Sequence, residues 1–251
     1  MGIIYKANKD RIRSLPEETV KVTDVLIEPG KTAAEVKLAP LSREEYERIL
    51  LKLDMLAIDR NNEAIAVMVA EEVDPIITLI RMVKVETKEE FTGILGSGAN
   101  LDITWLRPKD VGGPLLNSAG ASNKGLYGGA NGGVYSWLHT FTANTSEDII
   151  PEQIMAKTAG VIHLGAIDPV EVPKVNAIQF TIAGIPSPAQ SMKFNIRSSF
   201  GTESLPLVRF EKPVIVGPEK RQKITVMPNI SGDSKLELLS LLVTKAEALT
   251  L

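Results

Sequence analysis

The sequence contains no cysteine in its 251 residues, which excludes disulfides, zinc–thiolate sites and thiol nucleophiles. It contains only two histidines, His139 and His163, so the commonest general base of enzymes is almost absent. Aromatic residues are scarce as well, and a stacking surface would have to draw on six Phe, four Tyr and two Trp. These absences favour a structural or binding protein over an enzyme.

Long apolar runs and a strong net charge are also missing. No stretch approaches eighteen consecutive apolar residues, so we predict no transmembrane helix, and no apolar run of a secretory signal follows the first residues. Gly2 is a poor match to a myristoylation site because Lys6 stands where Ser or Thr is required. The formal net charge of −3 gives no general attraction to nucleic acid or anionic lipid, so any such affinity must be local.

The first residues carry a local positive charge. Within residues 1–15, Asp10 is the only acid, and the basic residues are Lys6, Lys9, Arg11 and Arg13. A solvated terminus explains this pattern, and so does a basic arm that touches phosphate or lipid head groups. We predict a basic N-terminal arm at residues 1–19, followed by one β-sandwich domain at residues 20–251.

One helix is strongly indicated near residues 42–58. Ser42 and Glu45 form the sequence pattern of a capping box. The apolar residues that follow share one helical face: Tyr46, Ile49, Leu50, Leu53 and Ala57. The next apolar runs, at 64–70 and 76–86, are rich in β-branched residues, and Asp74-Pro75 separates them. We predict strands there, although the alanines of the first run also allow a helix.

A long glycine-rich insertion is predicted at residues 93–133, which hold 11 of the 19 glycines. Such a region inside a compact domain is typical of a functional or a disordered segment. Gly96-Ser-Gly98 is no dinucleotide-binding fingerprint, because Leu101 stands where the third glycine is needed. Residues 120–125 likewise lack the Gly-Lys-Ser/Thr ending of a phosphate-binding loop.

Aromatic residues gather in or beside this insertion: Trp105, Tyr127, Tyr135, Trp137 and Phe141. They are candidates for anchors that pin the loop onto a neighbouring subunit. A surface that stacks on sugars or bases is the alternative. Because the region is poor in positive charge, we favour the subunit contact.

The rest of the chain has the pattern of a β protein. Strands are also expected at 20–27, 34–38 and 101–106, and a short helix near 151–157. Turn signals separate the candidate strands of the second half: Val134–Thr142, Gly160–Ile167, Ala177–Ile182, Met192–Ser198, Val208–Phe210, Val214–Val216, Lys223–Met227 and Leu236–Thr244. The leucines of the last segment also suit a helix. Many short strands at such spacing predict an antiparallel β-sandwich or barrel.

No motif of an active site is present. Ser97 does not lie in a nucleophile elbow, because residue 95 is Leu. His163 lies in an apolar strand pattern, which is typical of a core or interface histidine. Carboxylates show no metal-ligand spacing, so we predict no metal, no cofactor and no enzymatic activity. A paired-acid hydrolase using Asp102, Asp148 or Asp168 stays a third alternative, since such pairing is spatial.

Residues 160–245 resemble the closing strands of viral jelly-roll capsid proteins. The segments that carry the resemblance are Pro173–Phe180, Glu211–Pro218, Lys223–Pro228 and Leu236–Val243. It implies an antiparallel β-sandwich of jelly-roll type with an N-terminal arm and a small helical element. It also implies a coat protein that self-assembles through subunit contacts.

The resemblance further implies partners and a location. Copies of the chain itself and other virion proteins would be the partners, and the arm would face the genome or an internal membrane. The protein would be assembled in the host cytoplasm and reside in the virion, with no small-molecule substrate. The competing hypothesis from another class is a carbohydrate-binding or fibre-type β-sandwich module that uses the aromatic residues at 105–141 as a stacking surface.

Overall fold

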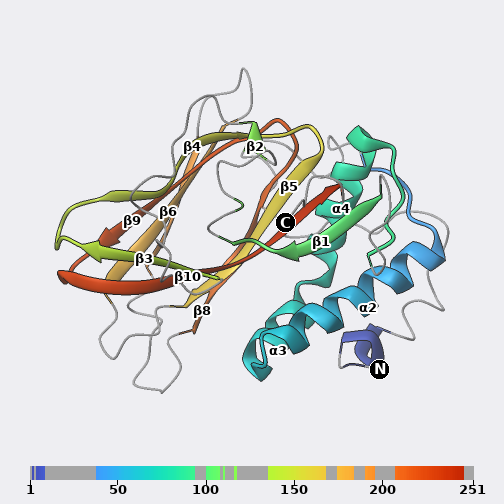
Figure 1. Ribbon diagram of the computed structural model, residues 1–251, viewed down its shortest axis with the longest axis horizontal. Helices are drawn as coiled ribbons and strands as arrows, with labels where there is room; N and C mark the ends of the chain where they lie inside the picture. The colour runs from blue at the N-terminus through green and yellow to red at the C-terminus, as the bar shows by residue number, and fades with distance from the viewer. Residues whose placement is uncertain are drawn as a thin grey trace.

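Two antiparallel sheets and a layer of helices make up the described part of the chain (Figure 1). The computed structural model describes residues 2, 4–8, 38–93, 100–107, 110, 116–117, 135–167, 174–183, 190–195 and 207–245. The antiparallel β-sandwich predicted from the sequence is confirmed. The predicted strand at 20–27, nearly all of that at 34–38 and most of the glycine-rich insertion lie outside the described residues.

The helical layer follows a short helical turn at residues 4–8 and consists of α2 (Arg43–Asp59), α3 (Glu63–Glu71) and α4 (Val73–Thr87). Both hydrogen bonds of the capping box between Ser42 and Glu45 are formed at the start of α2. The Asn62 side chain caps α3 by accepting a hydrogen bond from the Ile65 N–H at 3.3 Å. Figure 1 shows the three helices together at one end, beside the C-terminal part of the last strand.

The strands expected at 64–70 and 76–86 are wrong, because these residues form α3 and most of α4. Ile76, Ile80 and Val83 are spaced for one helical face, and that buried face outweighs the modest helix propensity of β-branched residues. Pro75 is tolerated because it lies in the first turn of α4, where a backbone N–H has no intrahelical partner.

The strands divide between two sheets. Sheet A has the order β1-β10-β5-β8, with β3 also paired to β10, and sheet B has the order β2-β4-β9-β6-β7. The strands of sheet A are β1 (Leu101–Trp105), β3 (Ser136–Phe141), β5 (Ala159–Ile167), β8 (Leu207–Val216) and β10 (Gly232–Lys245). Those of sheet B are β2 (Leu116–Asn117), β4 (Glu147–Met155), β6 (Val175–Ala183), β7 (Gln190–Asn195) and β9 (Arg221–Pro228).

From β3 to β10 the chain changes sheet at every connection except the one between β6 and β7. Its first strand in this series, β3, and its last, β10, are therefore neighbours in sheet A. The two sheets of the sandwich are thus built from strands that alternate along the chain.

Two apolar cores lie on the two sides of sheet A. Leu239, Leu241 and Val243 of β10 pack with the helices, whereas Leu238 and Leu242 pack between the sheets. A strand covered on both faces has no polar face, which explains why the leucine-rich sequence of β10 suited a helix as well. The strand favoured for this segment is confirmed.

Two further expectations need correction. The short helix expected near 151–157 is wrong, because β4 continues to Met155 and places Pro151 where its register with β9 shifts. The two strands expected at 208–210 and 214–216 are one strand, β8, with an irregularity opposite the segment of β5 between His163 and Gly165.

Candidate functional site

The outward face of sheet B is polar. Along β9 buried and partly exposed residues alternate, and ion pairs cross to β4 on the outer side. Arg221 contacts Glu152 at 2.9 Å, and Lys223 contacts Asp148 at 3.0 Å. The side chains of these four residues make this part of the face polar and stable in water.

The edge of sheet A at β8 is protected against strand addition. Glu211 and Lys212 are exposed there, and Pro213 removes a backbone donor from the same segment. Charged residues, proline and an irregular register are features that discourage another strand from pairing with an edge. Neither this edge nor the outer face of sheet B is therefore suited to apolar association.

The helical layer is different, because it exposes large apolar side chains. Met55 and Ile58 of α2 are 51% and 70% exposed, and Val67 of α3 is 43% exposed. Among the described residues these are the large apolar side chains that are exposed. We call these three residues the α2–α3 ridge. The opposite face of α2, with Leu50 and Leu53, is fully buried, so the ridge is additional to the face that the core uses.

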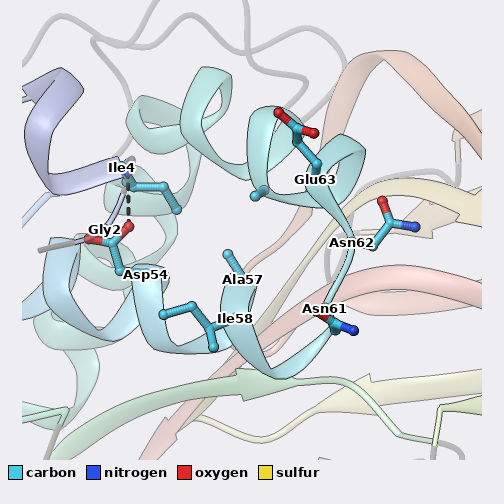
Figure 2. A pocket seen from close by; sticks show the side chains of 9 residues that line it. Gly2, Ile4, Asp54, Ala57, Ile58, Asn61, Asn62 and Glu63 are labelled. Atoms are coloured by element: carbon cyan, nitrogen blue, oxygen red, sulfur yellow. Dashed lines mark hydrogen bonds between the residues drawn. The ribbon is translucent and has the colours of Figure 1, made fainter.

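Two shallow hollows flank the corner between α2 and α3. Ile58 lines one and Val67 lines the other, while Asn61, Asn62 and Glu63 line both. Figure 2 shows the first hollow, with Ile58 and Ala57 on α2 and Glu63 at the start of α3. The ridge and the hollows together form an uneven, partly apolar surface on the outside of the molecule.

The beginning of the predicted basic arm is docked beside this surface. The backbone N–H of Ile4 donates to Asp54 Oδ1 at 2.9 Å (Figure 2). The backbone N–H of Tyr5 donates to Asp54 Oδ2 at 3.2 Å. A carboxylate at this place caps the helical turn at residues 4–8. A Cβ on Gly2 would clash with the Asp54 carboxylate, so a larger residue would require a shift. Lys6 is exposed on the docked turn.

The other predicted arm residues, Lys9, Arg11 and Arg13, lie outside the described residues.

Two of the predicted aromatic residues come together at the end of α2. The Arg60 guanidinium lies 4.2 Å from the centroid of the Tyr135 ring and 5.5 Å from that of Trp105. Arg60 also forms an ion pair with Glu237 of β10, and the buried Trp105 indole donates to the Leu56 carbonyl at 2.9 Å. This cluster fastens α2 to sheet A.

The Tyr135 hydroxyl donates to the carboxylate of Asp59 in the same cluster. Burial and the Asp59 carboxylate raise the pKa of Tyr135 above its ordinary value. Its phenol therefore stays neutral and serves as a hydrogen-bond donor.

The remaining aromatic candidates do not join this cluster. Phe141 is buried between the two sheets. Trp137 contributes backbone pairing between β3 and Leu236, while its side chain and the whole of Tyr127 lie outside the described part. Trp105 and Phe141 are thus used inside the subunit, and Tyr135 has a guanidinium against its ring. These three do not form an open stacking surface.

A small polar network lies between the sheets. His163 Nδ1 lies 2.7 Å from Ser240 Oγ, and His163 Nε2 lies 3.1 Å from Gln222 Oε1. Since an amide oxygen only accepts, Nε2 carries the proton and Nδ1 accepts from the serine hydroxyl. Burial lowers the pKa of His163 to about 4, against a weaker opposing effect of the Gln222 hydrogen bond. The sequence-based expectation of a core histidine is confirmed.

Two of the three carboxylates named as hydrolase candidates contact other side chains, and the third lies outside the described residues. Asp102 contacts Lys52 at 3.0 Å, and Asp148 accepts from Thr225 at 2.7 Å besides its contact with Lys223. Asp168 is not among the described residues. Within the described ranges, no three acidic or histidine side chains are grouped so that they could hold a metal ion. No described helix is long and apolar enough to cross a membrane.

Comparison with known proteins gives only distant likenesses. No protein-family model matches the chain, and no curated protein matches it. The VP2 subviral particle of infectious bursal disease virus is similar over 57% of this chain and about a third of its own, at 10% identity and a TM-score of 0.32. TmCBM61 in complex with β-1,4-galactotriose matches 60% of this chain and 91% of its own, at 10% identity and a TM-score of 0.26.

A ruminal GH26 endo-β-1,4-mannanase matches 62% of this chain and 27% of its own, at 14% identity and a TM-score of 0.23. At such TM-scores these likenesses assign neither a family nor a function. The functional conclusion therefore depends on the surface of the chain itself.

The α2–α3 ridge was not found by sequence reasoning, although a signal was present. Met55 and Ile58 lie three residues apart on the side of α2 that faces away from its buried residues. Apolar residues outside the buried face of a capped helix indicate a second contact.

Proposed function

We propose that this protein is a structural subunit that self-assembles into a viral capsid, as a coat protein, through contacts between copies of the chain. The observation that carries this proposal is the exposed apolar α2–α3 ridge. Met55 and Ile58 are exposed three residues apart on α2, and exposed apolar neighbours rimmed by polar residues mark sites of association. Among the described residues, the outer face of sheet B and the edge at β8 carry no exposed large apolar side chain, which favours the helical layer.

Three features of the subunit support this role. The helices, sheet A and sheet B form three layers with apolar cores between them, and close-packed cores make the subunit a rigid body. The Arg60 cluster ties the helical layer to sheet A, so an association through α2 would act on the whole subunit. The exposed Lys6 beside the same layer supports an arm that contacts a genome or an internal membrane.

The proposal is tested by measuring particle size with light scattering and by negative-stain electron microscopy of the purified full chain. We expect shells, sheets or large regular rings at moderate protein concentration. Ile58→Lys places a charge on the ridge and should reduce the assembled fraction at least tenfold. A protein that stays monomeric across salt and pH would contradict the proposal.

A matched control separates the ridge from a general effect of charge. Met227→Lys introduces the same charge at a partly exposed apolar position on the outer face of sheet B. We expect Met227→Lys to assemble as the wild type does. Equal loss of assembly in both variants would show that the ridge has no special part in it.

A further inference from the structure

The outward side of α2 carries one continuous stripe of side chains. Its members are spaced four or three residues apart, so they lie along one line of the helix surface: Glu44, Arg48, Leu51, Met55, Ile58 and Asn62. The stripe begins with charged residues, continues as an apolar stretch and ends at the corner before α3. No member of it is buried.

Opposite charges stand at the two ends of the apolar stretch. Arg48 lies at one end, where its contact with Glu44 is long, at 3.6 Å, and exposed. Glu63 lies at the other end, exposed at the start of α3 and lining both hollows. The Glu63 carboxylate has no hydrogen bond or ion pair with any residue in the described part of the chain. Arg48 and Glu63 are therefore available to a partner.

We propose that a second copy of the chain covers this stripe, with the two α2 helices antiparallel about a two-fold axis that passes beside Met55. This inference rests on the proposed self-assembly and specifies one of its contacts. An antiparallel pair centred on Met55 places Leu51 of each copy against the segment around Ile58 of the other. It also brings Arg48 to the corner where the partner's Glu63 lies.

Other registers place unlike surfaces together. Moving the axis one turn toward the start of α2, to Leu51, sets Glu44 opposite Ile58 and so buries a charge against an apolar side chain. Moving the axis to Ile58 sets Leu51 opposite α3, which departs from the line of α2 after Asp59. The Met55 register joins apolar to apolar and positive to negative.

A second copy fits the stripe because the stripe is complementary to itself. A two-fold axis presents every residue pair twice, so one arginine and one glutamate per copy give two contacts. The contact is about one helix wide, below the roughly 1,000 Å² expected of a stable isolated interface. The α2–α2 contact is therefore weak by itself, and an assembly would be held together by many such contacts.

The absence of cysteine in the sequence makes a clean cross-linking test. Met55→Cys places a thiol next to the axis, and mild oxidation or a short bismaleimide should give a covalent dimer. Glu44→Cys places an exposed thiol on the same stripe, but eleven residues away, so two copies of it lie roughly 33 Å apart. We expect at least tenfold more dimer from Met55→Cys, and equal yields would overturn the pairing.

Charge exchange tests the register independently. Arg48→Glu and Glu63→Arg should each weaken dimerisation roughly tenfold in sedimentation equilibrium. The double variant should recover most of the wild-type affinity, because the pair is restored with its signs exchanged. Thermal melting establishes that each single variant is folded. A double variant as weak as the product of the two single ones would overturn the proposed pairing.

Failure of the pairing is distinguishable from failure of the capsid proposal. Particles in the microscope without a Met55→Cys cross-link would overturn the α2 contact and leave self-assembly standing. Cross-linked dimers that never form larger particles would support the α2 contact and contradict the capsid. A monomer without cross-links would overturn both.

Discussion

His163 provides a quantitative test of the sandwich interior. Its ring is fully buried and neutral, with its pKa lowered from 6.5 to about 4 by burial. Below pH 6.5 the unfolded chain takes up a proton at this histidine, whereas the folded chain resists uptake until the pH approaches 4. Stability therefore falls as the pH falls through this window.

The size of the loss follows from the two pKa values. At roughly 1.4 kcal/mol for each pKa unit, the loss from His163 is about 2 kcal/mol at pH 5 and about 3 kcal/mol at pH 4, relative to pH 7. Proton uptake in the folded state would also break the hydrogen bond that Nδ1 accepts from Ser240. It would place a charge 4.9 Å from the Phe180 ring in the interior.

Urea unfolding of the wild type and of His163→Gln between pH 7 and pH 4.5 measures this effect. Glutamine keeps hydrogen-bonding groups beside Ser240 and Gln222 but does not titrate. The variant should be less stable at pH 7, and the difference should shrink by about 2 kcal/mol at pH 5. Parallel pH profiles, or an imidazole that titrates near pH 6.5 in NMR spectra of the folded protein, would refute the reasoning.

Three further predictions concern the helical layer. Asp54→Ala should remove the cap of the N-terminal turn, at a cost of about 1 kcal/mol, and accelerate amide hydrogen exchange at Ile4. Arg60→Leu should lower the free energy of unfolding by about 3 kcal/mol in urea titrations, because the mostly buried Glu237 loses its guanidinium. Burial raises the pKa of Glu45, but hydrogen bonds from Lys84 and from backbone N–H groups lower it below 4.5. Glu45 therefore stabilises the fold above pH 4.5 and loses this effect on further acidification, and Glu45→Gln should show a flatter stability curve there.

Sequence patterns predicted an element correctly where all the residues that determine it lie in one short segment. The α2 helix is of this kind, since its capping box and its apolar face lie within seventeen residues. The α3 and α4 segments were misread because their β-branched residues suit strands, and single-residue propensity outweighed the spacing of Ile76, Ile80 and Val83. Pro75 is compatible with this helix because it lies in the first turn of α4.

Contacts between segments far apart in the sequence could not be predicted from local sequence patterns. Arg60, Trp105, Tyr135 and Glu237 meet although they are up to 177 positions apart, and no local pattern relates them. The docking of Ile4 on Asp54 spans 50 positions in the same way. The aromatic residues were predicted to anchor a neighbouring subunit, and the Trp105 indole instead donates to α2 of its own chain.

The arrangement of layers gives a reason for the place of the ridge. Sheet A has apolar side chains on both faces, so the fold needs the helices to cover the face that sheet B leaves open. The core-facing side of α2 does this completely, with Leu50 and Leu53 fully buried. Ile58, at 70% exposure, adds little to that core, so a polar residue there would leave folding almost unchanged. An apolar ridge that folding does not require is best accounted for by contact with another molecule, and its stripe matches a second copy of itself.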